Sequence, residues 1–176
     1  MIIISPETFK DAFLKALPSR ESQIVSTWNS PKSRTEAMKD LLVEIAIILC
    51  LQLYKNDYYT IDAIFYKEKD ITYFSEKNTY AKYIAIAIEH ENVLNGTQVE
   101  INKLQILNAP LKVLITYAEC DTVKKFLTMY ANIIADSDVF SDISIKRKQL
   151  VIFGSYDGEK TDWSFHVYND KAFQTI

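Results

Sequence analysis

Two glutamates close an apolar segment in the middle of the chain. Residues 83–92 read YIAIAIEHEN, so Glu89 and Glu91 follow a run of apolar and aromatic residues. Side chains alternate between the two faces of a strand, so both glutamates face one side and His90 faces the other. Two like charges at the edge of an apolar core are costly unless a positive charge lies between them. The pair therefore indicates a divalent metal site.

Two further acids lie in segments that are otherwise apolar. Asp62 interrupts a run of aromatic and β-branched residues that is typical of a strand. Glu44 is the only charged residue between positions 41 and 54, where the apolar residues have helical spacing. Each acid is either a member of the same site or a residue at the solvent edge of its element, and the same alternative holds for Glu89 and Glu91.

The elements that would position these acids follow a simple order. A capping box from Ser33 to Glu36 opens a long helix whose second half is apolar nearly all round. The core elements are a helix, three strands, a helix and a strand, predicted at residues 33–54, 58–66, 71–74, 79–91, 97 onward for about ten residues, and 111–117. The last strand, helix and strand indicate a crossover onto a parallel neighbour.

The rest of the chain extends this core at both ends. Ser5 and Pro6 begin a helix that ends at Pro18, and a helix starts near Asp121. Two strands at 149–153 and 163–168 are joined by a turn. We therefore expect one α/β domain over residues 1–176, a mixed β-sheet flanked by helices, with its core at about 33–117 and a C-terminal helix and β-hairpin.

A second capping box explains another acid. Thr97 and Glu100 have the spacing of such a box at the start of the helix that follows the glutamate pair. Glu100 is therefore expected to cap this helix and to have no role in the site. Lys103 lies on the same helix.

The order of the elements and the placement of the acids resemble the PD-(D/E)xK nuclease superfamily, which has a restriction-endonuclease-like αβββαβ core. On this resemblance Glu44 corresponds to the acid of the first helix and Asp62 to the acid of the second core element. The residues from Glu89 to Glu91 correspond to the tripeptide that ends the third strand. Glu91 stands where the family has lysine, as in Glu-x-Glu variants. In some members the lysine lies on the following helix, where this chain has Lys103.

The resemblance implies a nuclease that hydrolyses DNA phosphodiester bonds with Mg²⁺ or Mn²⁺. Asp62 and Glu89 would bind the metal ion, which prefers carboxylate oxygens and polarises a phosphate and a water. Glu91 would orient that water, act as a base or share a second metal, and Glu44 would complete a two-metal site or fix a metal-bound water. Some relatives have lost catalysis, so a binding or assembly module is the alternative. An unrelated α/β fold with acids by chance is a third possibility.

Composition limits the other classes of function. The formal net charge of −3 argues against high-affinity, nonspecific nucleic-acid binding, and three glycines are too few for a Gly-rich phosphate loop. The start of the chain lacks the features of a signal peptide, no apolar run reaches the length of a membrane span, and the two cysteines are expected to be free thiols. We expect a cytoplasmic protein without a membrane partner. Small family members commonly act as homodimers or with a protein partner.

Overall fold

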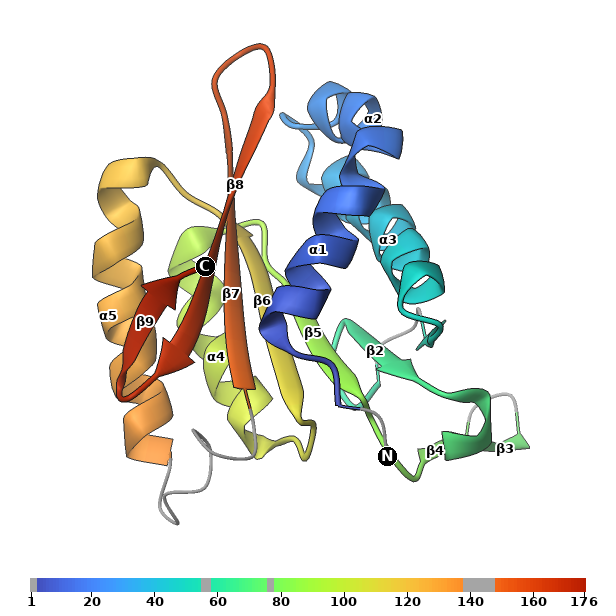
Figure 1. Ribbon diagram of the computed structural model, residues 1–176. Coiled ribbons are helices and arrows are strands. Elements are labelled where there is room, and N and C mark those ends of the chain that lie inside the picture. The colour runs from blue at the N-terminus through green and yellow to red at the C-terminus, as the bar shows by residue number, and fades with distance from the viewer. Residues whose placement is uncertain (1–2, 55–57, 76–77, 138–147) are drawn as a thin grey trace.

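The structure, a computed structural model, describes residues 3–54, 58–75, 78–137 and 148–176. In this part of the chain a seven-stranded mixed sheet lies between two layers of helices (Figure 1). The α-helices are α1 (Pro6–Ala16), α2 (Glu21–Ser26), α3 (Pro31–Ile48), α4 (Thr97–Ile106) and α5 (Cys120–Ser137). Short 3-10 helices are η1 (Leu17–Ser19), η2 (Glu68–Asp70) and η3 (Leu94–Gly96). The strands are β1 (Gln52–Tyr54), β2 (Ala63–Tyr66), β3 (Ile71–Ser75), β4 (Asn78–Ala81), β5 (Ile86–His90), β6 (Leu111–Tyr117), β7 (Lys148–Tyr156), β8 (Thr161–Asn169) and β9 (Ala172–Thr175).

The large sheet has the strand order β1-β2-β5-β6-β7-β8-β9. The first three strands in this order, β1, β2 and β5, pair antiparallel. Strands β5, β6 and β7 pair in parallel, and β8 and β9 continue the sheet with antiparallel pairing. The helices α4 and α5 connect the parallel strands. The mixed sheet with flanking helices confirms the predicted fold class, and the parallel pairing of β5 with β6 confirms the predicted parallel neighbour.

The helices form two separate layers on the sheet. Helices α1 and α3 cover one face, and α4 and α5 cover the other (Figure 1). The face toward α3 buries, among others, Phe65, Ile88, Val113 and Ile152. The face toward α4 buries, among others, Ile64, Ala87, Leu114 and Val151. Each central strand therefore alternates between two cores, as expected of a sheet that is buried on both faces.

The first core helix differs from its prediction at both ends. Helix α3 begins at Pro31 after the N-cap residue Ser30, so the capping box predicted to open it at position 33 is wrong. The helix ends at Ile48 because the chain turns at Cys50, where φ is 54°. Positive φ is uncommon for a residue other than glycine, so this turn has no sequence signal. The residues predicted as the last helical turn form β1 instead.

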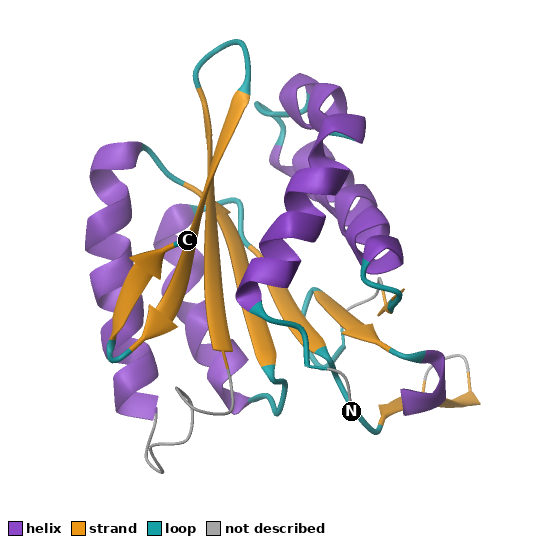
Figure 2. Ribbon diagram, in the orientation of Figure 1, coloured by secondary structure: helices purple, strands orange, loops and turns teal. Residues whose placement is uncertain are grey.

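The three strands between the two core helices consist of other segments than those predicted. The predicted strand 58–66 begins with a tight turn and reduces to β2, and the predicted strand 79–91 divides into β4 and β5. Strands β3 and β4 form a two-stranded hairpin of their own, which Figure 2 shows beside the large sheet. The predicted order of helix, three strands, helix and strand is present as α3, β1, β2, β5, α4 and β6, with this hairpin inserted between β2 and β5.

The remaining elements agree closely with the sequence. Helix α1 begins at Pro6, and the side chain of Ser5 accepts a hydrogen bond from the backbone of Thr8. Strand β6 covers the predicted residues 111–117, and β7 and β8 form the predicted C-terminal hairpin in longer form. The short strand β9, which pairs with β8, was not predicted.

Candidate functional site

Asp62 and Glu89 lie together where β2 begins and β5 ends. The antiparallel register pairs Ala63 with Ile88, so the next pair along these strands is Asp62 and Glu89. Asp62 Oδ2 accepts a hydrogen bond from the backbone N–H of His90 at 2.9 Å. The charge of Asp62 also acts on the carboxyl group of Glu89. Two of the four predicted acids therefore share one site.

Lys103 brings a positive charge to this site from α4. Its Nζ lies 3.1 Å from Glu89 Oε1 and also contacts Glu100 Oε2. Burial acts to lower the pKa of Lys103, but its contacts with Glu100 first and then with Glu89 outweigh it, and the pKa lies above its usual value. The lysine is therefore charged and lies between two carboxyl groups. One of these is Glu100, which was expected to have no role in the site.

The capping box predicted for Glu100 is wrong. The N-cap of α4 is Gly96, and no side chain caps this end of the helix. Thr97 Oγ1 instead donates a hydrogen bond to Leu94 O and contacts Tyr130. The carboxylate of Glu100 is consequently available to Lys103, one helical turn further along α4.

Glu89 is fully buried, with an exposed fraction of 0%. Its two carboxyl oxygens lack a hydrogen-bond partner among the described residues, and the closest cation is Lys103, whose Nζ forms a 3.1 Å ion-pair contact with Oε1. Burial and then the charge of Asp62 raise the pKa of Glu89 to about 9, against the lowering effect of Lys103. The carboxyl group therefore holds a proton at neutral pH, which a bound cation would displace.

A tight turn precedes Asp62 and closes one side of the site. Tyr58 and Ile61 exchange backbone hydrogen bonds across this turn, and its central residues Tyr59 and Thr60 have φ of 50° and 71°. Asn and Gly usually take these two positions, so Tyr and Thr here store backbone strain. Lys103 Nζ donates a hydrogen bond to Thr60 O at 3.2 Å. The lysine thus links the strained turn to the acids.

Glu91 is turned into the loop before α4. Its Oε1 accepts a hydrogen bond from the backbone N–H of Val93 at 2.7 Å. A Cβ atom built on Gly96 would lie 3.4 Å from Glu91 Oε2, so the carboxylate fills the space beside this glycine. Glu91 is therefore held by its own loop and, in this conformation, does not join Asp62 and Glu89.

Glu44 lies on the other side of the sheet. It belongs to α3, which packs on the face opposite to α4. Its Oε1 accepts a hydrogen bond from Arg20 Nε at 2.6 Å, and its Oε2 contacts the hydroxyl group of Ser19. The Ser19 and Arg20 contacts lower the pKa of Glu44. The structure does not bring this acid to the site that Asp62 and Glu89 form.

The opposite face of β5 ends in a buried polar network. His90 Nε2 is 2.9 Å from the hydroxyl group of Tyr117, and the Arg34 guanidinium lies 3.8 Å from the centre of the Tyr117 ring. Arg34 Nε donates a hydrogen bond to Asn92 Oδ1 at 2.7 Å. Burial, followed by the charge of Arg34, lowers the pKa of His90 to about 3. The imidazole is neutral and fixes the end of β5 from the side away from the acids.

Of the four predicted acids, only the pair of Asp62 and Glu89 suits a hard cation. No group of three or more His, Cys, Asp and Glu side chains in residues 3–54, 58–75, 78–137 and 148–176 is arranged to hold a metal ion. Asp62 and Glu89 nevertheless present adjacent carboxyl groups, one of them with two buried oxygens that lack hydrogen-bond partners in this part of the chain. Mg²⁺ is commonly bound by one or two carboxylates and fills its other positions with water and substrate oxygens. The pair therefore fits such an ion.

Comparisons with known proteins identify no family for this chain. The sequence matches no model of a known protein family, and a comparison with curated proteins finds no match. Only the site itself therefore indicates a function for this protein. No helix in the described part of the chain is long and apolar enough to cross a membrane.

Sequence reasoning missed the role of Glu100 and most of the network behind β5. The spacing of three between Glu100 and Lys103 places both on one face of α4, and this was the available signal. The contact of Arg34 with Tyr117 joins residues that are far apart in the chain and had no such signal.

Proposed function

We propose that this protein is a metal-dependent nuclease that hydrolyses DNA phosphodiester bonds. The site would consist of Asp62 and Glu89 as ligands of Mg²⁺ or Mn²⁺, Lys103 as the cationic residue, and Glu100 as the residue that positions Lys103. The observation that carries the proposal is the 3.1 Å contact between Lys103 Nζ and Glu89 Oε1. It places a lysine beside the acid that ends β5, although Glu91 takes the lysine position in the sequence.

The order of the core elements supports the same proposal. The chain runs through α3, β1, β2, β5, α4 and β6, which is the helix, three strands, helix and strand order of the PD-(D/E)xK nucleases. Asp62 precedes β2, Glu89 lies near the end of β5, and Lys103 comes from the following helix. These are the positions that the resemblance gives to the two acids and to a lysine displaced onto the helix.

The chemistry follows from the charges in the site. A bound divalent cation would polarise the scissile phosphate and lower the pKa of a water. Asp62 and Glu89 would hold that cation, with Glu89 giving up its proton. The ammonium group of Lys103 would stabilise the negative charge that develops on the phosphate, and Glu100 would keep the ammonium aimed at the site. Glu91 could orient a water only after its bond to Val93 opens.

A plasmid-nicking assay tests this function. Wild-type protein with Mg²⁺ or Mn²⁺ is expected to convert supercoiled DNA to nicked or linear DNA, and Glu89→Gln is expected to abolish cleavage. Glu44→Gln is the matched control, because the same chemical change is made at an acid on the other face of the sheet. Cleavage that survives Glu89→Gln, or that Glu44→Gln abolishes in a folded protein, would show that the site is placed wrongly.

A catalytically inactive nuclease fold that acts as a binding or assembly module is the second candidate. One observation favours it: Lys103 Nζ already contacts both Glu89 and Glu100, so an ammonium group lies beside these carboxyl groups without a metal ion. This candidate predicts that DNA remains intact with Mg²⁺ and Mn²⁺ at every concentration tested, while the protein remains folded.

The proposal also places the protein in the cytoplasm, where it would act as a homodimer or with a protein partner. Cys50 and Cys120 are both free and exposed, which agrees with a reducing compartment. Light scattering of the purified protein measures whether it is a monomer or a dimer.

A further inference from the structure

A cavity lies at the carboxyl ends of β6 and β7, apart from the site of Asp62 and Glu89. Its volume is about 320 Å³. The residues that line it include Trp28, Arg34, Glu119, Thr122, Ser155 and Tyr156. Ligands of open α/β sheets bind outside the carboxyl ends of the strands. Small-molecule sites occupy about 300–1,000 Å³, so this cavity has room for one small ring system and not for a duplex.

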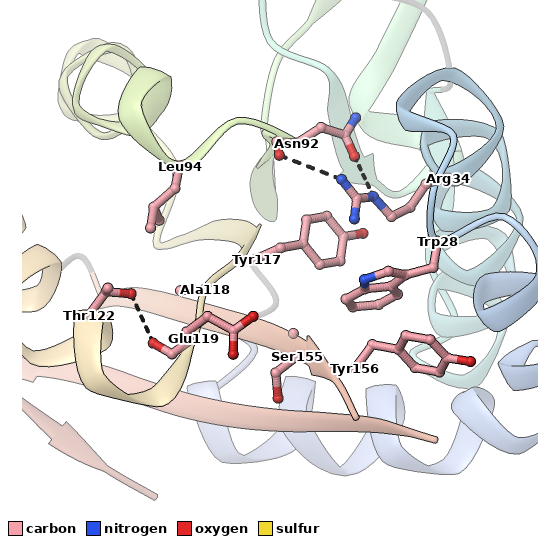
Figure 3. A pocket seen from close by; sticks show the side chains of 11 residues that line it. Trp28, Arg34, Asn92, Leu94, Tyr117, Ala118, Glu119, Thr122, Ser155 and Tyr156 are labelled. Carbon is pink, nitrogen blue, oxygen red and sulfur yellow. Dashed lines mark hydrogen bonds between the residues drawn. The ribbon is translucent and has the colours of Figure 1, made fainter. Parts of the chain in front are cut away.

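Aromatic rings form one wall of this cavity. Figure 3 shows Trp28, Tyr117 and Tyr156 on one side and Leu94 and Thr122 on the other. The Trp28 and Tyr156 ring centres are 5.3 Å apart, and those of Trp28 and Tyr117 are 5.1 Å apart. Trp28 and Tyr156 are only partly buried. Two aromatic faces at the mouth of a small cavity suit a flat ring as a ligand.

Arg34 lies against this wall and also lines the cavity. Its guanidinium lies 3.8 Å from the Tyr117 ring centre and 5.2 Å from the Trp28 ring centre. Arg34 is only 7% exposed, and no Asp or Glu in the described ranges forms an ion pair with it. Its partner is the neutral amide of Asn92. A buried cation without a counter-ion favours a ligand that offers acceptor atoms.

Polar groups of both kinds reach the rest of the cavity. The carboxylate of Glu119 is exposed and accepts hydrogen bonds, whereas the hydroxyl groups of Ser155 and Thr122 can donate and accept them. Thr122 Oγ1 donates to Glu119 O at 2.8 Å, which fixes the first turn of α5 beside the cavity (Figure 3). A negative charge at Glu119 disfavours a phosphate there. A neutral flat ring with donors and acceptors along its edge fits these groups.

The segment after β5 joins this cavity to the proposed nuclease site. Glu89 lies in β5 on the face toward α4, and Asn92 and Leu94, a few residues further on, line the cavity. One short stretch of chain thus borders both places. A nucleic-acid strand that lies across the end of β5 would have its phosphates near Glu89 and a base near the cavity.

We propose that this cavity receives one unstacked nucleobase of the nucleic-acid substrate. The base packs on the ring of Tyr156 beside Trp28, whose ring is tilted by 39° from that of Tyr156, and Arg34, Glu119 and Ser155 contact its edge. Stacking on aromatic side chains tolerates any base, whereas the polar contacts to the base edge would set a preference among bases. The inference rests on the proposed function, since it names single-stranded or locally unpaired nucleic acid as the form that the nuclease site acts on.

Binding to abasic DNA tests this proposal. A short fluorescently labelled single strand is compared with a strand of the same length in which abasic residues replace the bases, so that the phosphates remain. Fluorescence anisotropy is measured with the full chain in EDTA, so that no cleavage takes place. The wild-type protein is expected to bind the strand with bases about tenfold more tightly, and Tyr156→Ala is expected to remove most of this difference.

Two further variants keep the test independent of folding. Thr122→Phe narrows the cavity from the wall opposite to the rings and is expected to lower base-dependent binding without removing an aromatic group. Tyr80→Ala is the matched control for Tyr156→Ala, because Tyr80 is an exposed tyrosine of the separate hairpin. Thermal unfolding confirms that each variant is folded.

The outcomes separate this proposal from the nuclease itself. Equal binding of the two strands by the wild-type protein, or unchanged preference in both Tyr156→Ala and Thr122→Phe, would overturn the base site even if the protein cleaves DNA. A preference for bases that these two variants lose would support the site even in a protein that cleaves nothing, and the nuclease proposal alone would then fail.

Discussion

Lys103 and Glu89 lie against each other where α4 crosses the end of β5, with 3.1 Å between Nζ and Oε1. The sequence separates them by the loop that contains Glu91 and by most of α4. The fold therefore gives a buried acid a cation from the next element, although the residue two positions further along the chain is Glu91, an acid. Four consequences of this arrangement and of the network behind it can be measured.

Replacement of Lys103 by methionine removes the cation and keeps the length of the side chain. We expect Lys103→Met to lower DNA cleavage by about 100-fold or more, because loss of a group that stabilises transition-state charge has an effect of that size. Initial rates of plasmid nicking measure the change. Lys124→Met, an exposed lysine of α5, is the control. Equal rates for the two variants would exclude Lys103 from the reaction.

The stability of the metal-free protein should fall as pH rises. The pKa of Glu89 is about 9 in the folded protein and 4.5 by its usual value, so between these values the folded state binds a proton that the unfolded state has lost. Stability is therefore lost with increasing pH, by up to about 1.4 kcal/mol per pH unit. Urea unfolding in EDTA measures this slope.

The useful window for that measurement lies above about pH 6.5. His90 has a pKa of about 3, below its usual 6.5, so its contribution to stability is lost only as pH falls below 6.5. Glu89→Gln keeps the shape of the side chain without the titration, and its slope between about pH 6.5 and 9 should be flatter. An unchanged slope in this variant would assign the pH dependence to other groups.

A divalent cation should stabilise the folded protein and depend on Asp62. A ligand that binds only the folded state stabilises it by about 2.7 kcal/mol at a hundredfold excess over Kd, which raises Tm. We expect Mn²⁺ to raise the Tm of the wild-type protein and to have little effect on Asp62→Asn. Calorimetric titration with Mn²⁺ checks the same difference directly. Equal Tm shifts in the two proteins would locate the cation elsewhere.

Removal of the Asn92 side chain should destabilise the end of β5 from its other face. Asn92 Oδ1 accepts a hydrogen bond from Arg34, and its Nδ2 donates to Thr35 Oγ1 at 2.7 Å. Asn92→Ala leaves the buried guanidinium without this acceptor, which costs about 1–3 kcal/mol. Chemical denaturation measures the loss. Ser33→Ala, at an exposed position of the same helix as Arg34, should change stability by less than about 0.5 kcal/mol.

The sequence was sufficient to predict those features of the structure that depend on a single local pattern. The side-chain alternation placed Glu89 and His90 on opposite faces of β5, and the structure confirms this: Glu89 contacts α4 while His90 contacts Tyr117. The pairing of Asp62 with Glu89 was expected from the resemblance, which gives one acid to the second core element and one to the end of the third strand, although those strands were assigned inaccurate boundaries. The placement of the two acids was therefore predicted correctly although the boundaries of the strands were not.

The segments whose secondary structure was predicted wrongly have backbone conformations that their residue types do not indicate. Cys50, Tyr59 and Thr60 all have positive φ, and each turns the chain where apolar or aromatic residues suggest a continuous helix or strand. Glu100 was assigned to a capping box because the local pattern matched. The contact that decides its orientation is with Lys103, whose own position depends on Glu89 in another element. Tertiary contacts of this kind override a local motif.

The two faces of β5 make this strand intolerant of insertions of a single residue. Its pairing with β2 and with β6 fixes both edges, and its alternation gives an acid to one face and an imidazole to the other. One added residue between Ile86 and Glu89 would exchange the faces, so that the carboxyl group would meet Tyr117 and Arg34 while the imidazole would meet Lys103. Two added residues would restore the faces. Length variation in this strand is therefore expected only in steps of two, whereas the separate β3–β4 hairpin carries no such restriction.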